Sequence, residues 1–212
     1  MIKKAIVGLI FAFLLLSSQG FAQSNEIGFL AGGMFSPTTD RVNGVACIAI
    51  DPNCAAANHS SSQISYEGVV AHRLANLHLA SFYLELPVVG VPNRTVRHDT
   101  LLPGSVNVFQ SYSSVFFTPG FKLKFSLPVL SPFVSVGGGF AHFSPDTNSL
   151  GTTPSSSTTG AFQVGGGIDL GLIPHIAIRG EVREFYSGNP FSSSLETSRH
   201  NIFAGAGLVL HF

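Results

Sequence analysis

Apolar residues alternate with small or polar ones along most of this chain, and the last stretch shows the pattern best. Every second residue from Ile202 to Phe212 is apolar. The positions between them include Gly205, Gly207 and His211. A period of two indicates a strand with two different faces, and about ten residues is the length that a tilted strand needs to cross a bilayer. The stretch therefore predicts either a membrane-spanning strand that closes a barrel or an ordinary strand of a soluble sandwich.

The same pattern recurs upstream, between clusters of Ser, Thr, Pro, Asn and Gly that are typical of turns and loops. It predicts about eight strands, over residues 26–35, 63–74, 78–89, 109–125, 132–143, 160–172, 176–186 and 200–212. Pro119 falls inside the fourth of these, and because proline donates no hydrogen bond to a ladder we expect a bulge or bend there. The glycine triplets 137–139 and 165–167 predict room inside the strands for large neighbouring side chains.

The connections alternate in length. Long ones are expected at residues 36–62, 90–106, 144–159 and 187–199, and short ones at 75–77, 126–131 and 173–175. Outer-membrane barrels combine short periplasmic turns with longer extracellular loops. The rhythm therefore favours a barrel with an even number of strands and with both chain ends on the periplasmic side.

Composition separates the two architectures further. Only 10% of the residues are charged, against roughly 25% in soluble domains. After the amino terminus, no apolar run approaches the ~20 residues of a membrane helix. Closed barrels are the other structures that satisfy every backbone group in lipid. We therefore predict an all-β protein, an eight-stranded antiparallel up-and-down transmembrane β-barrel.

The amino terminus reads as a secretory signal. Lys3 and Lys4 precede an apolar segment, 5–16, and Gly20-Phe21-Ala22 offers the small residues that a signal peptidase recognises. We expect cleavage after Ala22, although a retained membrane anchor is the alternative. The domains would then be a signal peptide, 1–22, and an outer-membrane barrel, 23–212.

Charged side chains are expected inside the barrel, opposite the apolar rows, because charge on the lipid face costs several kcal/mol near the midplane. The expected lumen charges are Glu26, Glu67, Arg73, Glu85, Lys122, Lys124, Asp169, Arg179, Glu181 and Arg183. Their signs balance in this assignment, and Glu184 is the exception on the lipid face. An eight-stranded barrel is just wide enough for side chains to fill, so we predict a closed lumen without an open diffusion pore.

Two cysteines, Cys47 and Cys54, lie in the first long connection. In an exported chain a close pair predicts a disulfide that pins a loop. A metal site is the alternative, but only His59 lies nearby as a further ligand, and we expect neither a metal nor a cofactor. The equal numbers of basic and acidic residues give no basic surface for nucleic acid.

At the level of pattern, residues 24–212 resemble the small outer-membrane β-barrel family that includes the OmpA/OmpX-type and opacity-type barrels. The resemblance rests on segments 27–33, 132–139, 179–183 and 205–212. It implies an outer-membrane location of the Gram-negative type, contact with lipid and lipopolysaccharide, and a carboxy-terminal signal for the barrel-assembly machinery. That signal would comprise Leu208, Leu210 and Phe212. The chain ends at the barrel, so the peptidoglycan-binding domain of full-length OmpA-type proteins is not implied.

Two functions follow from this pattern. The first is a non-enzymatic barrel with a structural or surface-interaction role, whose extracellular loops can bind a ligand. The second is an outer-membrane lipid A-modifying enzyme, because His142-Phe143-Ser144 is similar to the base and nucleophile of the lipid A deacylase. Pro145 replaces the asparagine expected next, and the motif lies on the fifth strand rather than near the carboxy terminus. The first function is therefore the one that the sequence favours.

Overall fold

A computed structural model describes residues 24–36, 57–60, 63–77, 79–99, 108–127, 130–146, 155–188 and 198–212. All of its regular elements are strands. They are β1 (Asn25–Phe35), β2 (Ala57–Ser60), β3 (Gln63–Asn76), β4 (Ala80–Asp99), β5 (Val108–Phe117), β6 (Gly120–Phe125), β7 (Leu130–Pro145), β8 (Ser157–Ile173), β9 (Ile176–Gly188) and β10 (Ser198–His211). The described residues contain no helix long and apolar enough to cross a membrane.

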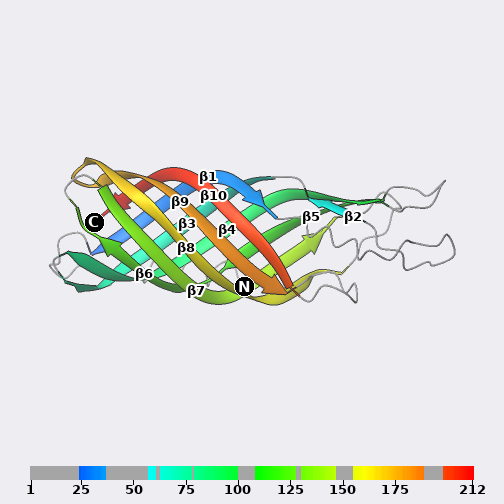
Figure 1. The fold of residues 1–212 in the computed structure, drawn as a ribbon, viewed down its shortest axis with the longest axis horizontal. Coiled ribbons are helices and arrows are strands. Elements are labelled where there is room, and N and C mark those ends of the chain that lie inside the picture. Colours follow the sequence, from blue (N-terminus) through cyan, green and yellow to red (C-terminus); the bar gives the residue numbers. More distant parts are fainter. Residues whose placement is uncertain are drawn as a thin grey trace, which may run out of the picture.

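The strands close into a barrel. Neighbours in sequence pair antiparallel around the sheet, and β1 pairs both with β3 and with the last strand, β10. Because β5 and β6 together occupy one position between β4 and β7, the wall has eight strands in up-and-down order. Figure 1 shows these strands running obliquely around the barrel. The predicted fold class is confirmed.

The bend expected at Pro119 is also present. The fourth wall strand is interrupted at residues 118–119, between β5 and β6. The carbonyl oxygen of Pro119 accepts a hydrogen bond from the backbone N–H of Gly138 on β7, at 3.0 Å. The chain therefore stays attached to the wall where proline removes a donor from the ladder.

The predicted loop over residues 90–106 is wrong for most of its length. β4 continues to Asp99, and residues 94–98 pair with residues 108–112 of β5. The ladder shifts its register between Val91 and Arg94, where Pro92 lies. Proline and asparagine at 92–93 indicate a loop in the sequence, but the ladder resumes over the β-branched Thr95 and Val96, which favour a strand. The short strand β2 pairs with residues 96–99 and lies inside the predicted loop 36–62.

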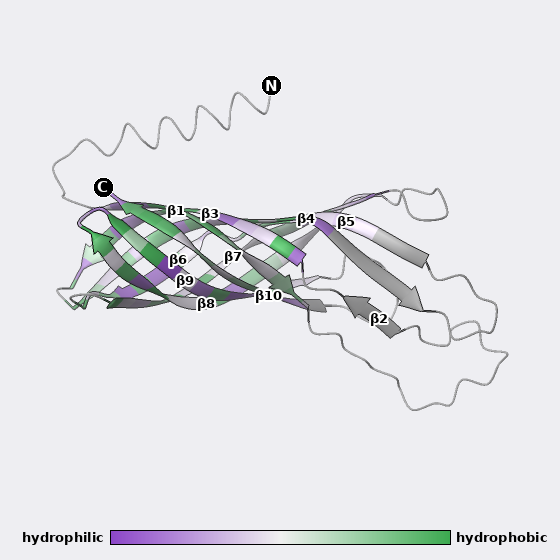
Figure 2. Cartoon of the chain, turned by 90° about the horizontal axis from the view of Figure 1, so that it is seen from above, coloured by the Kyte–Doolittle hydropathy of each residue, from purple (hydrophilic) through white to green (hydrophobic). Residues whose placement is uncertain are grey.

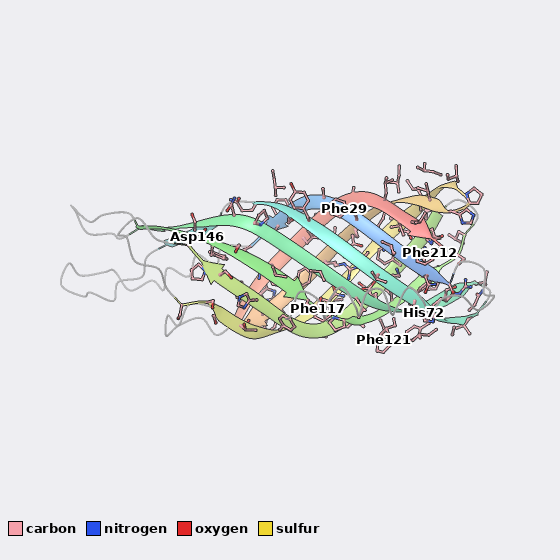
Figure 3. All side chains as sticks on the ribbon, turned by 180° about the vertical axis from the view of Figure 1, so that it is seen from behind. Phe29, His72, Phe117, Phe121, Asp146 and Phe212 are labelled. Carbon is pink, nitrogen blue, oxygen red and sulfur yellow. The ribbon has the colours of Figure 1, made fainter. Side chains whose placement is uncertain are left out.

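The barrel has two different ends. Three pairs of strand ends that are joined by short connections lie at the end that holds the carboxy terminus, as predicted from the rhythm of lengths. They are Asn76 and Ala80, Phe125 and Leu130, and Ile173 and Ile176. Figure 3 shows His72 and Phe212 at this end and Asp146 at the other. The β4–β5 hairpin and β2 project beyond the barrel on the long-loop side (Figure 1). We call the two ends the turn end and the loop end.

Each wall strand turns one row of side chains outward. Apolar residues such as Phe29, Phe121 and Leu208 are exposed on the outer wall, and Figure 2 shows hydrophobic and hydrophilic residues alternating along the strands. The other row is buried in the lumen and includes both charged and aromatic residues. An apolar exterior around a partly charged interior is the arrangement of a membrane barrel.

Candidate functional site: the filled lumen

Among the described residues, the lumen contains nine buried acidic and basic side chains. They are Glu26, Glu67, Glu85, Lys122, Lys124, Asp169, Arg179, Glu181 and Arg183. The period of two places them there, since each stands on its strand in the row opposite the apolar outer row. All nine were expected in the lumen from the sequence.

A lower cluster forms near the turn end, from Glu26, Lys122, Lys124, Asp169 and Arg179. Glu26 accepts from three cations, at 2.5 Å from Lys122 Nζ, 2.9 Å from Lys124 Nζ and 3.0 Å from Arg179 Nη2. Asp169 is held by Arg179 through two hydrogen bonds, of 2.6 and 2.8 Å, and by Lys124 at 2.6 Å. Residues from β1, β6, β8 and β9 are thereby tied together across the lumen.

Aromatic rings also contact the cations of the lower cluster. Lys122 Nζ lies 4.9 Å from the centre of the Tyr83 ring and 5.5 Å from that of Phe133. The guanidinium of Arg179 lies 4.6 Å from the centre of the Phe133 ring. Because a desolvated cation is attracted to the face of an aromatic ring, these contacts offset part of the cost of burying the charges.

A middle cluster lies farther toward the loop end, where three carboxyl groups surround one guanidinium. Arg183 is 2.7 Å from Glu85 and 3.1 Å from Glu67, and it also contacts Glu181. Gln163 joins them, since its carbonyl oxygen accepts a hydrogen bond from Arg183 at 2.9 Å. Lys122 links the two clusters, because its Nζ is also 3.9 Å from Glu85.

Arg73, which the sequence also assigned to the lumen, is half-buried rather than fully buried. It continues the inner row of β3 and pairs with the buried Tyr83 at the turn end, before the register shifts between Arg73 and Ala75. Among the fully buried side chains, five carboxyl groups therefore face four cations.

An apolar plug fills the lumen on the loop side of the middle cluster, and the sequence interpretation missed it. Its largest members are Leu30, Met34, Tyr112, Phe116, Phe143, Phe185 and Phe203, all fully buried. Phe116 is central, with ring centres 4.8 Å from Phe185 and 6.0 Å from Phe143. The signal that could have revealed the plug is position, because Phe185 and Phe203 stand at the alternate positions of their strands that face inward. The sequence interpretation expected apolar residues to face lipid, so it did not assign these rings to the lumen.

The glycine triplet 165–167 makes room for charged neighbours, as expected. A Cβ on Gly165 would lie 2.8 Å from Cγ of Arg183, and one on Gly167 would lie 2.7 Å from Cβ of Glu181. Gly205 and Gly207 of the closing strand make room for other neighbours. A Cβ there would meet the Phe203 ring at 2.4 Å or the carbonyl oxygen of Phe29 at 2.0 Å. These two glycines accommodate an aromatic ring and a neighbouring strand.

Among the described residues, one group could bring three metal ligands together. Atoms of Glu26, Asp169 and His211 lie within 4.8 Å of one another. Lys122, Lys124 and Arg179 already contact the two carboxylates. A metal cation would have to enter among three positive charges, so this group is better described as an ion-pair network.

The lipid A-modifying motif does not assemble a base and a nucleophile. His142 and Ser144 belong to the outward row of β7, since Ala141 and Phe143 between and beside them are buried. The hydrogen bond of His142 Nδ1 is with the hydroxyl of Thr158, at 2.7 Å. Ser144 pairs across the ladder with Ser113 of β5. In the described part of the chain, His142 therefore forms its hydrogen bond with Thr158 rather than with Ser144.

Outward residues near both ends complete the candidate sites. Leu208, Leu210 and Phe212 are exposed on the outer face at the turn end, while Glu184, near the loop end, pairs with His200 at 2.5 Å. Whether the first three act as an assembly signal stays a prediction. The predicted Cys47–Cys54 disulfide and the signal peptide, 1–22, lie outside the described residues.

The geometry defines a class, a small outer-membrane-type barrel with a filled lumen. A solved structure supports the fold: Neisserial surface protein A has a TM-score of 0.52 at 13% identity, over 91% of this chain and all of that one. OprG from Pseudomonas aeruginosa gives 0.46 at 12% identity, over 92% and 98% of the two chains. Ail of Yersinia pestis gives 0.43 at 12% identity, over 88% and 97%. The chain matches no protein-family model, and it has no significant match among curated proteins. At these identities the likeness shows the fold alone, and it confirms the predicted resemblance to small outer-membrane barrels at that level.

Proposed function

We propose that this protein is a non-conducting, non-enzymatic anchor in the outer membrane of a Gram-negative-type cell, and that it presents a surface for extracellular interactions. In this proposal the signal peptide, 1–22, directs export, and residues 23–212 form the barrel domain. The observation that carries the proposal is the filled lumen. A barrel that is closed along its interior can hold a surface structure in place but has no path for solutes.

Two successive barriers support the absence of a pore. The lower and middle clusters fix charged side chains across the lumen through ion pairs of 2.5 to 3.1 Å. Beyond them the apolar plug packs aromatic rings against one another, and Phe116 and Phe185 have no exposed surface. An ion would have to displace both, and tightly packed aromatic rings solvate an ion poorly compared with water.

The projecting hairpin supports a surface role. Residues 96–98 of β4 pair on one side with β2 and on the other with β5, so three strands form a small sheet beyond the loop end (Figure 1). In the described residues β2 pairs with β4 alone and forms an edge of the sheet. An edge strand offers unpaired backbone donors and acceptors, which is how sheets recruit extended segments of a partner.

Contacts with the membrane and with the assembly machinery belong to the same proposal. The exposed apolar residues of the outer wall would face lipid, and the long connections would reach the lipopolysaccharide side. Leu208, Leu210 and Phe212 form an apolar, outward-facing row at the end of the closing strand. Such a row is accessible to a partner before lipid covers it. A Cys47–Cys54 disulfide would stabilise the first extracellular connection.

Planar-bilayer recordings test the anchor, because a closed lumen predicts no large and stable conductance from the purified, heat-modifiable barrel. Reproducible open-channel steps would overturn the proposal. Proteolysis of intact cells tests the surface. Protease added outside should cleave the hairpin over residues 92–111 and leave the barrel strands protected, whereas cleavage only after the outer membrane is broken would place the hairpin inside.

A further inference from the structure

The buried charges of the lumen leave one negative charge without a partner. Five carboxyl groups face four cations among the nine buried acidic and basic residues. An unpaired buried charge is costly enough that proteins usually pair it or neutralise it. Arg73 is a further cation of the inner rows, but it stands six residues from Glu67 on β3, about 20 Å along the strand. It is therefore too far from the middle of the barrel to compensate a carboxyl group there.

The surplus is located in the middle cluster. The lower cluster has three cations for two carboxylates, and His211 lies beside it, 3.5 Å from Glu26. A charge on His211 would only add to the positive excess there. The middle cluster has three carboxyl groups and one guanidinium, and the nearest further cation, Lys122, is closer to Glu26 than to Glu85.

Glu67 is the carboxyl group that lacks a donor. It is fully buried, and neither of its oxygens receives a hydrogen bond, although Arg183 Nε lies 3.1 Å from one of them. The same atom, Arg183 Nε, contacts an oxygen of Glu67 and an oxygen of Glu181, so the two carboxyl groups lie side by side around one N–H group. Ionised carboxylates only accept hydrogen bonds, so two of them in contact repel unless a proton lies between them.

Among the described residues, the other charged and polar groups near this pair are already engaged. They are Glu85 on β4, Lys122 on β6, Ser135 on β7, Gln163 on β8, and Arg179 and Arg183 on β9. Arg179 stands two residues before Glu181 and is paired with Asp169 and Glu26. Arg183 is shared among all three carboxyl groups, and the amide nitrogen of Gln163 donates to Glu85. In the described residues the potential metal ligands converge in the lower cluster rather than here.

We propose that Glu67 and Glu181 form a proton-binding site in which the two carboxyl groups share one proton. The proton supplies the missing donor to Glu67 and removes the surplus charge, so that the nine buried groups become neutral as a set. The ligand of this site is a proton, and the barrel takes it up as it folds.

The proton makes the stability of the barrel depend on pH. At neutral pH an unfolded chain leaves these glutamates ionised, so the folded barrel binds one more proton than the unfolded chain. Stability then falls as pH rises through the range in which the site releases its proton. Glu67→Gln replaces the protonated carboxyl by a neutral group that keeps a donor, and it should abolish this fall.

Infrared spectroscopy of the full chain refolded in phosphatidylcholine vesicles in D₂O tests the proposal directly. At neutral pH, where exposed carboxyls are ionised, the wild type should show the C=O band of a protonated carboxyl group. The band should disappear in Glu67→Gln and remain in Glu184→Gln, which alters a partly exposed glutamate on the outer face. Urea unfolding in the same vesicles should give Glu67→Gln a midpoint that no longer falls at alkaline pH.

Several outcomes would overturn the proposal. One is a wild-type spectrum without the band, which requires no variant to fold, and another is a band that persists in both Glu67→Gln and Glu181→Gln. A loss of urea resistance in Glu67→Gln as large as that in Glu26→Gln would make Glu67 an ordinary ion-pair partner. If replacing choline chloride by sodium chloride stabilised the wild type without any protonated-carboxyl band, a metal cation would occupy the site instead.

Discussion

Glu26 and Glu67 are both buried glutamates of the lumen, yet their surroundings differ in a way that decides their roles. Glu26 is contacted by three cations, whereas Glu67 approaches one guanidinium that two other carboxyl groups also contact. The same residue type therefore serves as a counter-ion near the turn end and as a proton acceptor in the middle of the barrel. The distribution of cations among the strands produces this difference.

Glu26→Gln should destabilise the barrel strongly. The substitution leaves Lys122 and Arg179 buried with less negative charge around them, and removing one partner of a buried pair typically costs about 3–5 kcal/mol. Urea unfolding in lipid vesicles measures the change. Glu184→Gln is the matched control, because Glu184 pairs with His200 while it is partly exposed, and exposed pairs contribute up to about 1 kcal/mol. Equal effects of the two substitutions would contradict the structure.

Phe116→Ala should be more destabilising than Phe162→Ala. Phe116 is fully buried in the plug, so truncation leaves a cavity and costs about 3–5 kcal/mol. Phe162 is half-exposed on the outer wall, where lipid can fill the space, so only its transfer free energy of about 2 kcal/mol is lost. Urea midpoints in vesicles compare the two. If Phe162→Ala were the more destabilising, the plug would not be a packed core.

At the scale of the element, the closing strand β10 depends on how closely it approaches β1. The two strands pair from Glu26 with His211 through Phe35 with Ile202. A Cβ at Gly207 would lie 2.0 Å from the carbonyl oxygen of Phe29 on β1, whereas one at Gly180 of β9 meets no atom within 4 Å. The absence of a side chain is therefore required at one glycine of the wall and not at the other.

Gly207→Ala should impair closure of the barrel. The new methyl group must push β1 and β10 apart, and overpacking of this kind costs about 1–3 kcal/mol and occasionally more. Electrophoresis with and without boiling measures the fraction of closed, heat-modifiable barrel, which should fall. Gly180→Ala should leave that fraction unchanged. A normal heat shift and normal urea resistance in Gly207→Ala would show that the seam between the strands can relax.

The wall strands were predictable because lipid outside and a filled lumen inside impose a strict period of two on the sequence. This rule placed Glu85 inside and Leu84 outside correctly, and the break at Pro119 followed from its missing donor. The rule fails where its physical cause ends. Beyond the loop end no lipid enforces alternation, so residues 94–99 read as a loop, although pairing with β5 makes them a strand.

At the scale of the whole molecule, the lumen divides into a charged part and an apolar part, and the sequence did not predict this division. The charged rows predicted the ion pairs, but partner choice depends on register across strands far apart in the chain, as with Glu26 and Arg179. The apolar plug could not be predicted, because a phenylalanine such as Phe185 or Phe203 looks the same in a sequence whether it faces lipid or the lumen. The two environments, lipid and lumen, are distinguished only once the strands have closed into a barrel.

The final aromatic residue belongs to this scale as well, because it joins the end of the chain to its first strand. Phe212 N–H donates to the carbonyl oxygen of Asn25 at 3.0 Å, and Asn25 N–H donates to that of Phe212 at 2.8 Å. These two hydrogen bonds complete the circle of strands at the turn end. The ring of Phe212 faces outward and is 37% exposed, so the backbone and the ring have separable roles.

Deletion of Phe212 and the substitution Phe212→Ala should therefore differ in a way that separates closure from recognition. Phe212→Ala keeps both backbone hydrogen bonds, so the purified protein should refold in vesicles with nearly normal urea resistance. In cells it should yield less heat-modifiable barrel in outer membranes if the assembly machinery reads the aromatic ring. Deletion should lower both quantities, because it also removes the link to Asn25. Normal recovery of Phe212→Ala from outer membranes, beside a defective deletion variant, would confine the role of Phe212 to closing the barrel.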